Sequence, residues 1–409
     1  MVKNFYKFID QCQISKNKNI IKFLSLGKLP LVNTMSNKDL NNPELFAPLD
    51  LYYCPISKLV QLGVIIDQKL LFPKSYPYTS STTKILRDNF RDLRIEIESN
   101  NLIKKNDLVI DIGSNDGNLL SNFKENYKVL GVTPELIGKI AIKNGIPTII
   151  DYFNSDVAKT ILRKYGKAKI ITATNVFAHI DKIDYILKNI KKILSKDGCF
   201  ISESHYLMPL IINNQYDTVY HEHLRYYSLT SLNFLFQKHG LEIFNAKKIN
   251  THGGSIRVYA SLKNSKKINP IIKKIYKEER IINIKYLKKF QSKVVLSKLK
   301  LLSILYPLKN NKKKIAGISA PSRATTLINY CGLDSNIIEV IFEIKGSKKI
   351  GLNIPGTNIP VVEEKLSEIR KYDYLILFSW HIKDQLIKIF RHKGYKGKFI
   401  TPLPNPKIL

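Results

Sequence analysis

Acidic residues, arginine and cysteine are all scarce in this chain of 409 residues. Thirty-three Asp and Glu stand against 66 Lys and Arg, which gives a formal net charge of +33. Ten of the basic residues are Arg, which leaves 56 Lys (66 − 10). Such an excess indicates nucleic acid, an anionic membrane or another phosphate-bearing partner. Arg is the side chain best suited to bidentate contacts with phosphates or bases, and it is scarce here. The net charge alone therefore does not identify the partner.

The four cysteines are too few for a disulfide scaffold in a chain of this length. The sequence has no run of about 18 apolar residues, which excludes a membrane-spanning helix. The first residues, MVKNFYKFIDQC, lack the apolar stretch of a secretory signal. With 44% hydrophobic residues available for buried cores, we expect a folded cytoplasmic protein with reduced cysteines and no membrane partner.

Four segments of the chain differ in character. Residues 1–80 are rich in proline and short irregular elements. Residues 81–262 alternate apolar strands with helices, which predicts a parallel sheet covered on both faces. Residues 263–314 hold 17 Lys and Arg against two Glu, with apolar residues at helical spacing, and predict a basic helical connection. Residues 315–409 repeat the strand–turn–helix pattern and predict a second, smaller α/β domain.

Residues 109–117, Val-Ile-Asp-Ile-Gly-Ser-Asn-Asp-Gly, form the most informative motif. A buried strand ends at Asp111, and Gly113 and Gly117 open the next helix. Glycines there let a ligand approach the backbone, and the helix start offers N–H donors. The spacing is neither the G-x-G-x-x-G of dinucleotide folds nor a P-loop. It resembles motif I of the class I S-adenosylmethionine (SAM) methyltransferases, and the alternative is a turn that needs glycine for geometry alone.

The next strand ends at Thr133, where such folds normally place a carboxylate for the ribose hydroxyls. Either Glu135 substitutes from the following turn, or the ribose is held more weakly. Residues 175–179, Asn-Val-Phe-Ala-His, end a later strand where a methyltransferase fold closes over its ligand. The resemblance therefore implies a cofactor site formed by Asp111, Gly113, Asn115, Gly117, Thr133, Glu135 and Asn175.

Titratable groups concentrate in residues 220–223, Tyr-His-Glu-His. Two His beside a Glu are typical of metal ligation or of proton transfer. The H-x-H spacing does not place both imidazoles on one helix face, and the pattern is not the H-E-x-x-H of zinc proteases. A general base with a neighbouring carboxylate is the sharper hypothesis, and a solvated surface loop is the alternative.

Two further segments carry polar groups beside glycine or proline. Residues 252–257, His-Gly-Gly-Ser-Ile-Arg, precede a strand and suit a backbone edge packed against a ligand, although a plain β-turn explains them nearly as well. Residues 76–81, Tyr-Pro-Tyr-Thr-Ser-Ser, offer phenols and hydroxyls, and their alternative is a proline-ordered turn on the core.

Together these segments resemble the SAM-dependent C-methyltransferases of nucleotide-linked deoxysugars, over nearly the whole chain. The N-terminal part contributes P-L-x-N (30–33), L-V-Q-L (59–62) and Y-P-Y-x-S-S (76–81). D-I-G-S-N-D-G, N-V-F-A-H, Y-H-E-H and H-G-G-S-I-R-V-Y follow in the family's order. The C-terminal part adds N-Y-C-G (329–332), P-G-T-x-I-P-V (355–361) and F-S-W (378–380).

The resemblance implies an α/β enzyme with an N-terminal zinc-binding-like module, a Rossmann-like SAM-methyltransferase domain and a smaller Rossmann-like domain that holds the nucleotide. The implied reaction transfers the SAM methyl group to the carbon next to a keto group, after a base has removed a proton. His223 would be that base, with Glu222 orienting it or assisting in the proton transfer. The other catalytic positions are Tyr76, Tyr78, His179 and Tyr220. The substrate positions are His252, Gly253, Gly254, Ser255, Arg257, Ser319 and Arg323.

The family's N-terminal module usually carries C-x-x-C twice, which forms a tetrahedral zinc site. Here Cys12 is followed by Ser15, and Cys54 by Ser57, so one cysteine of each pair is lost. A hydroxyl is a poor zinc ligand beside a thiolate. We expect the module to fold without zinc and the chain to hold no metal.

Three alternatives stay open. A SAM methyltransferase acting on oxygen or nitrogen of another small metabolite would use the His-Glu-His segment to deprotonate its acceptor. A basic nucleic-acid-binding protein, such as an RNA methyltransferase, would need aromatic residues interleaved with Arg. The basic segment 263–314 has almost no Arg, so a small-molecule partner is favoured. A relative that has lost its activity is the third alternative, given Thr133, Ser15 and Ser57.

Overall fold

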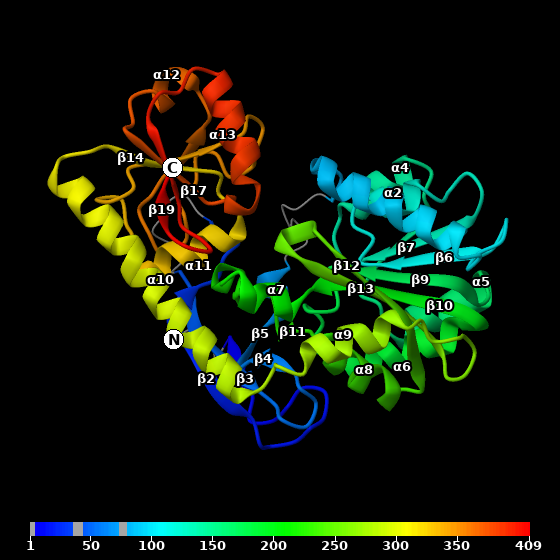
Figure 1. Cartoon of the computed structure of the whole chain (residues 1–409). Helices are drawn as coiled ribbons and strands as arrows, with labels where there is room; N and C mark the ends of the chain where they lie inside the picture. Colours follow the sequence, from blue (N-terminus) through cyan, green and yellow to red (C-terminus); the bar gives the residue numbers. More distant parts are fainter. Residues whose placement is uncertain (1–4, 36–43, 73–79) are drawn as a thin grey trace.

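The computed structural model describes residues 5–35, 44–72 and 80–409. Figure 1 shows an N-terminal module at the bottom, a larger α/β domain on the right and a smaller α/β domain at the upper left. None of the helices in these ranges combines the length and apolarity needed to span a bilayer.

A seven-stranded sheet in the order β12-β13-β10-β9-β6-β7-β8 forms the larger domain. The five strands from β10 to β8 are parallel, whereas β13 is antiparallel to both of its neighbours. This is the class I SAM-methyltransferase arrangement, so the predicted fold class is confirmed. The strands are β6 (Leu108–Ile112), β7 (Lys128–Thr133), β8 (Thr148–Ile150), β9 (Ala168–Thr174), β10 (Leu194–His205), β12 (Leu241–Ile249) and β13 (Ser255–Leu262).

Helices cover both faces of this sheet. Successive residues of β6 point to opposite faces, and all of them are buried. Val109 packs in the layer that contains α2 (Lys84–Ser99), whereas Ile110 packs in the layer of α5, α6 and α8. Burial on both faces explains why this strand begins with three consecutive apolar residues, Leu108 to Ile110. Figure 1 shows α2 above the sheet and α6 and α8 below it. The lower helices are α5 (Ser155–Lys164), α6 (Ile183–Ile193) and α8 (Leu229–Lys238).

The N-terminal module is built on a four-stranded antiparallel sheet in the order β11-β4-β3-β2. Three strands come from the module itself: β2 (Ile21–Pro30), β3 (Phe46–Tyr53) and β4 (Val60–Leu62). The fourth, β11 (Arg225–Tyr226), directly follows the Tyr-His-Glu-His segment, and Arg225 pairs with Gln61. Main-chain hydrogen bonds therefore join the module to that segment.

The basic connection forms α9 (Ile271–Glu279) and α10 (Ile284–Asn310) and leads into the smaller domain. The sheet of this domain has the order β16-β15-β14-β17-β18-β19. The chain runs outward from β14 to β16 and then returns to β17, so the order reverses between β14 and β17. In open α/β sheets, ligands bind beyond the carboxyl ends of the strands at such a reversal. The strands are β14 (Ile315–Ile318), β15 (Ile341–Glu343), β16 (Val361–Glu363), β17 (Tyr374–Leu377), β18 (Lys398–Thr401) and β19 (Lys407–Ile408); α11 (Ser322–Cys331) follows β14.

Candidate active site between the two α/β domains

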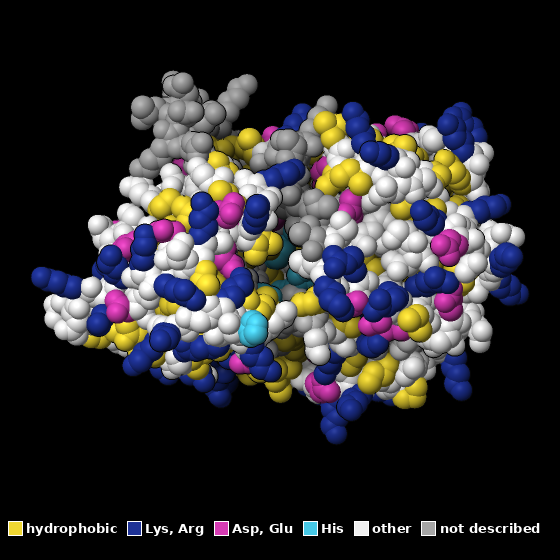
Figure 2. Space-filling model, turned by 90° about the horizontal axis from the view of Figure 1, so that it is seen from above, with side chains coloured by type: hydrophobic (Ala, Val, Ile, Leu, Met, Phe, Trp, Pro, Cys, Tyr) yellow, Lys and Arg dark blue, Asp and Glu magenta, His cyan; other side chains and the backbone are white. Residues whose placement is uncertain are grey.

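A hollow lies between the two lobes of the molecule, and the two α/β domains contact each other near the carboxyl ends of β10 and β14, where Gln215 lies between His205 and Arg323. Figure 2 shows this hollow between the two lobes, with His side chains visible inside it. Arg323 of α11 pairs with Asp217 of the larger domain, with 3.0 Å between Nε and Oδ2. Ser322 Oγ donates to Asn33 Oδ1 of the N-terminal module at 3.0 Å. These contacts hold all three parts of the chain together around the hollow.

The turn after β6 has the geometry that its glycines predicted. Gly113 and Gly117 both adopt a φ of +80°. A Cβ on Gly113 would lie 2.3 Å from Val176, and one on Gly117 would lie 2.8 Å from Ala141, so only glycine fits at either position. Asp111 lies one residue before the end of β6, and its buried carboxyl group accepts a hydrogen bond from Thr172 Oγ1 at 2.6 Å. Burial raises the pKa of Asp111 to about 7.

This turn and the end of β7 fit the amino-acid and ribose parts of SAM. The Asp111 carboxylate is a charge partner for an ammonium group, whereas the space at the two glycines is filled by the side chains of Val176 and Ala141. The fully buried Thr133 donates its hydroxyl to the Glu135 carboxylate. A carboxylate therefore does lie at the end of the second strand, carried by Glu135, and it suits the two ribose hydroxyls.

The last two residues of the Tyr-Pro-Tyr-Thr-Ser-Ser motif are tied to the same turn. The main-chain N–H of Ser80 donates to Asn115 Oδ1 at 2.9 Å, and its hydroxyl donates to Asp116. The N–H of Ser81 donates to the other Asp116 oxygen at 3.1 Å. These bonds place the end of the motif beside the glycine turn after β6. Tyr76 and Tyr78 lie outside the described residues, so their contact with a substrate stays a prediction.

The His179 and His223 rings contact each other, and both have defined tautomers. His223 Nδ1 lies 3.0 Å from the carbonyl oxygen of Thr218, and His179 Nδ1 lies 2.8 Å from that of Glu222. A carbonyl oxygen only accepts, so in both rings Nδ1 carries the proton and Nε2 the lone pair. The ring centroids of the two histidines are 5.0 Å apart, and the Tyr220 ring stacks on His223 at 4.1 Å.

Both imidazoles are neutral at physiological pH. Burial lowers the pKa of His179 to about 4. Burial, reinforced by repulsion from the other histidines of the hollow, lowers the pKa of His223 well below its usual value. A neutral imidazole is the form that can remove a proton, so the electrostatics of the hollow suit a general base.

The Glu222 side chain contacts the N-terminal module. Its buried carboxylate accepts a hydrogen bond from Asn33 Nδ2. The orienting bond to His223 that the resemblance gave to Glu222 is made by the Thr218 carbonyl, whereas the main chain of Glu222 holds His179. His221 is 1% exposed and bonds the Ala47 carbonyl at 3.1 Å, which fastens this segment to the module.

Gln215 links the His-Gly-Gly turn to the hollow. Its Nε2 donates to the Gly253 carbonyl at 2.7 Å, and its Oε1 lies 3.1 Å from His205 Nε2. Gly254 has a φ of +122°, and a Cβ there would lie 2.6 Å from Pro209. The turn therefore packs on the protein through its glycines.

Two other predicted site residues make hydrogen bonds within the protein. The hydroxyl of Ser255 donates to the Thr251 carbonyl. The main-chain N–H of Asn175 donates to the main-chain carbonyl of Glu203 at 2.8 Å.

Arg257 has a structural role in place of the substrate contact that the resemblance implied. Its guanidinium is fully buried and pairs with Glu203 at 3.0 Å and with Glu96 at 2.8 Å. It also donates to Asn89 Oδ1 at 2.8 Å. These partners lie on β10 and α2, so the charge of Arg257 ties the helix to the sheet.

Arg323 is also committed within the protein. Besides its pair with Asp217, its Nη1 lies 3.0 Å from His381 Nδ1, and its guanidinium lies 5.2 Å from the Trp380 ring. Trp380 Nε1 donates to Asp217 at 2.8 Å. Arg323 therefore closes the contact between the two α/β domains, where the sequence predicted a phosphate ligand.

Lys349 is a cation beside the β14 turn that sequence reasoning missed. Its Nζ donates to the Ala320 carbonyl at 2.6 Å, next to Ser319, which adopts a φ of +68°. Burial lowers the pKa of Lys349, and the carboxylates of Glu343 and Glu222 oppose that shift. No sequence signal distinguishes Lys349 from the other lysines of this Lys-rich stretch.

The four positions of the two C-x-x-C pairs come together in the N-terminal module. Cys12 Sγ lies 3.1 Å from Ser57 Oγ, and Ser15 Oγ lies 3.5 Å from Cys54 Sγ. Within the described residues, no group of three or more His, Cys, Asp or Glu side chains could hold a metal ion. Two thiols and two hydroxyls form a hydrogen-bonded cluster that does not fit zinc.

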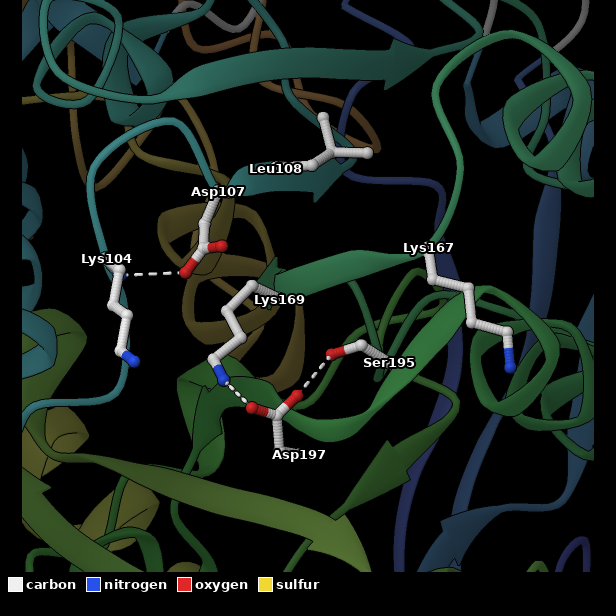
Figure 3. A pocket seen from close by; sticks show the side chains of 7 residues that line it. All are labelled: Lys104, Asp107, Leu108, Lys167, Lys169, Ser195 and Asp197. Carbon is white, nitrogen blue, oxygen red and sulfur yellow. Dashed lines mark hydrogen bonds and ion pairs between the residues drawn. The ribbon is translucent and has the colours of Figure 1, made fainter.

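A second hollow lies at the opposite edge of the seven-stranded sheet (Figure 3). Lys169 pairs there with Asp197, which also accepts from Ser195, and the main-chain N–H of Lys104 donates to Asp107. Its two carboxylates are thus engaged within the protein, and the strand ends that carry the glycine turn face away from it.

Three family models match successive parts of the chain, described as "Putative zinc binding domain" (residues 12–72), "Methyltransferase domain" (85–246) and "C-methyltransferase C-terminal domain" (250–404). The C-methyltransferase NovU of Streptomyces niveus is 29% identical over 411 residues, which cover 98% of this chain and 97% of that protein. Two solved structures are also similar. A SAM-dependent methyltransferase from Clostridium acetobutylicum has 16% identity and a TM-score of 0.34 over 44% of this chain and 93% of its own. Magnesium protoporphyrin IX methyltransferase from Synechocystis, with bound SAH, has 14% identity and a TM-score of 0.34, and the match covers 43% of this chain and 83% of that chain. The matched models make the protein a SAM-dependent methyltransferase, and its residues 250–404 are similar to the C-terminal domain of C-methyltransferases.

Proposed function

We propose that this enzyme methylates the carbon atom next to the keto group of a nucleotide-linked keto-deoxysugar. The observation that carries the proposal is the pair formed by His223 and His179. Each ring donates its Nδ1 proton to a main-chain carbonyl and has its lone pair on Nε2. Burial lowers the pKa of both rings, so both are neutral. Carbon becomes a nucleophile only after its proton is removed, so this chemistry needs such a base.

His223 would accept the proton on Nε2, while the electron pair of the C–H bond moves toward the keto oxygen. The negative charge of the resulting enolate favours an imidazolium beside it, which offsets part of the cost of charging a buried ring. When bound, SAM supplies an electrophilic methyl group. Tyr220 stacks on His223 and restricts its ring, and positioning of this kind contributes strongly to the rate.

His179 suits a different task. With its proton on Nδ1, its Nε2 only accepts hydrogen bonds, so the neutral ring fits a sugar hydroxyl better than an enolate oxygen. Donors to the enolate oxygen would then be hydroxyl groups, a role that fits the phenols of Tyr76 and Tyr78.

The smaller domain would hold the nucleoside diphosphate where its strand order reverses. Ser319, the N–H groups at the start of α11 and the Lys349 ammonium are the groups there that suit two phosphates. Arg323 would act indirectly, by fixing α11 against Asp217. His252, Gly253 and Gly254 would border the sugar from the larger domain.

Incubating the enzyme with SAM and a panel of 4-keto deoxysugar nucleotides, with the matching 4-hydroxy compounds as controls, tests the proposal. Mass spectrometry should show the gain of one methyl group for a keto sugar only. In D₂O without SAM, the same substrate should exchange the hydrogen next to its keto group. Methylation of the hydroxy compounds, without that exchange, would assign the enzyme to oxygen methylation instead.

A further inference from the structure

The outer face of α10 carries a stripe of exposed apolar side chains. Val295, Leu296, Leu299 and Tyr306, the α10 stripe, recur at helical spacing and are exposed by 45%, 64%, 55% and 76%. The opposite face of the helix is buried, through Leu287, Phe290, Val294, Ser297, Leu301 and Leu305. A helix that is apolar on its inner and its outer face presents more apolar surface than packing within this chain uses.

Lysines border the stripe. α10 contains seven lysines and no Asp or Glu, and Lys288, Lys289, Lys293 and Lys300 are exposed beside the apolar side chains. Three further lysines, at 312–314, follow the helix, and the sequence has no acidic residue between Glu279 and Asp334. The surface is therefore apolar at its centre and strongly positive around it.

The helix is also placed to meet a flat surface. Figure 1 shows α10 along the left outer edge of the molecule. Its 27 residues, at a rise of 1.5 Å each, span about 40 Å, so the stripe and its lysines can touch one plane together.

Although the sequence predicts no membrane partner, we propose that the α10 stripe docks the enzyme on the surface of an anionic lipid bilayer. Charge complementarity selects this occupant. A second copy of the chain would bring two rows of lysines together. The bases of nucleic acid stack on aromatic side chains, whereas three of the four side chains of the stripe are aliphatic. On a bilayer, the apolar side chains would enter the boundary between headgroups and acyl chains. The lysine stems would cover apolar surface while their ammonium groups meet the anionic headgroups.

Co-sedimentation of the full chain with vesicles tests this assignment, using phosphatidylcholine with about 30% phosphatidylglycerol and pure phosphatidylcholine for comparison. We expect the wild-type protein to bind the anionic vesicles at least about tenfold more tightly. Leu296→Ser/Leu299→Ser should lose at least about tenfold of that affinity, and Lys288→Glu/Lys289→Glu should do the same. Ile95→Ser/Leu162→Ser, which removes exposed apolar side chains from α2 and α5 without changing the charge, should bind like the wild type. Calorimetry with SAM checks that each variant is folded.

Three results would overturn the proposal. The first is that wild-type protein does not bind anionic vesicles. The second is that the stripe variant binds as tightly as its control, which would assign binding to the net charge of +33 and not to the stripe. The third is a dimer in light scattering that Leu296→Ser/Leu299→Ser dissociates, because the stripe would then belong to an interface between two copies.

Discussion

His179 and Glu222 are joined by a hydrogen bond of 2.8 Å from the imidazole Nδ1 to the main-chain carbonyl oxygen. The carboxylate of the same glutamate accepts a hydrogen bond from Asn33. Position 222 therefore serves the site through two separate groups, and a side-chain substitution removes only one of them. His223, in contrast, acts through its side chain, so a substitution there removes the Nε2 lone pair altogether.

Replacing His223 by Asn should lower turnover by about 10²–10⁴-fold, because the proton acceptor is lost. SAM affinity should stay near the wild-type value. Single-turnover methyl transfer and calorimetry measure the two quantities. Glu222→Gln is the matched variant, since it keeps the carbonyl that holds His179, and it should retain more activity than His223→Asn. Wild-type turnover in His223→Asn would refute the assignment of the base.

SAM affinity should depend on pH through Asp111. Burial raises the pKa of this carboxyl group to about 7, so its negative charge appears as the pH rises through that value. If the carboxylate neutralises the ammonium group of SAM, affinity should increase about tenfold between pH 6 and pH 8. Calorimetry across this range measures the change. Asp111→Asn should bind SAM more weakly and with a flat pH dependence, and a slope that persists in this variant would point to another group.

Removing the guanidinium of Arg323 should destabilise the protein by about 3 kcal/mol, because Asp217 would stay buried without its cation. Denaturant unfolding of Arg323→Ala measures the loss. Lys371→Ala is the control, since Lys371 pairs with Glu368 at the surface, and it should cost less than about 1 kcal/mol. Arg323→Met/Asp217→Leu should recover much of the stability. A loss in Arg323→Ala no greater than in the control would mean that the buried pair does not hold the domains.

Restoring two cysteines should create a zinc site in the N-terminal module. Ser15→Cys/Ser57→Cys would complete four thiols at positions that already contact one another. Metal analysis should then find about one zinc per chain, and a chelator should lower the melting temperature of the double variant but not of the wild type. One zinc per wild-type chain would show that the Cys–Ser cluster binds metal as it stands.

The sequence predicts the geometry of the glycine turn after β6 well because its constraint is local. Gly113 and Gly117 need a left-handed backbone and space for neighbouring side chains, and both needs show as a spacing along one strand and helix. The class I sheet follows from the same alternation of strands and helices. Glu135 could be suggested as a replacement for the missing carboxylate because it lies two residues after Thr133.

The arginines and Asn33 could not be assigned in this way, because their partners lie far away in the sequence. Arg257 is committed to Glu203 and Glu96, and Arg323 to Asp217, and no local pattern reveals these ion pairs. Asn33 forms hydrogen bonds with Glu222 and Ser322, which come from two other parts of the chain. The sequence shows which chemical group a polar residue carries, but not which other residue that group contacts in the fold.

The pairing of β11 with β4 determines when the N-terminal sheet can be completed during protein synthesis. Arg225 meets Gln61 across 164 residues (225 − 61). At about 5–20 residues per second, the ribosome needs about 8–30 s to make that stretch. Until then, the nascent N-terminal sheet exposes an unpaired strand edge, which is prone to pair with other chains. The strand that closes this edge emerges just after His223, so the N-terminal sheet is completed only once the segment carrying the proposed base has been made.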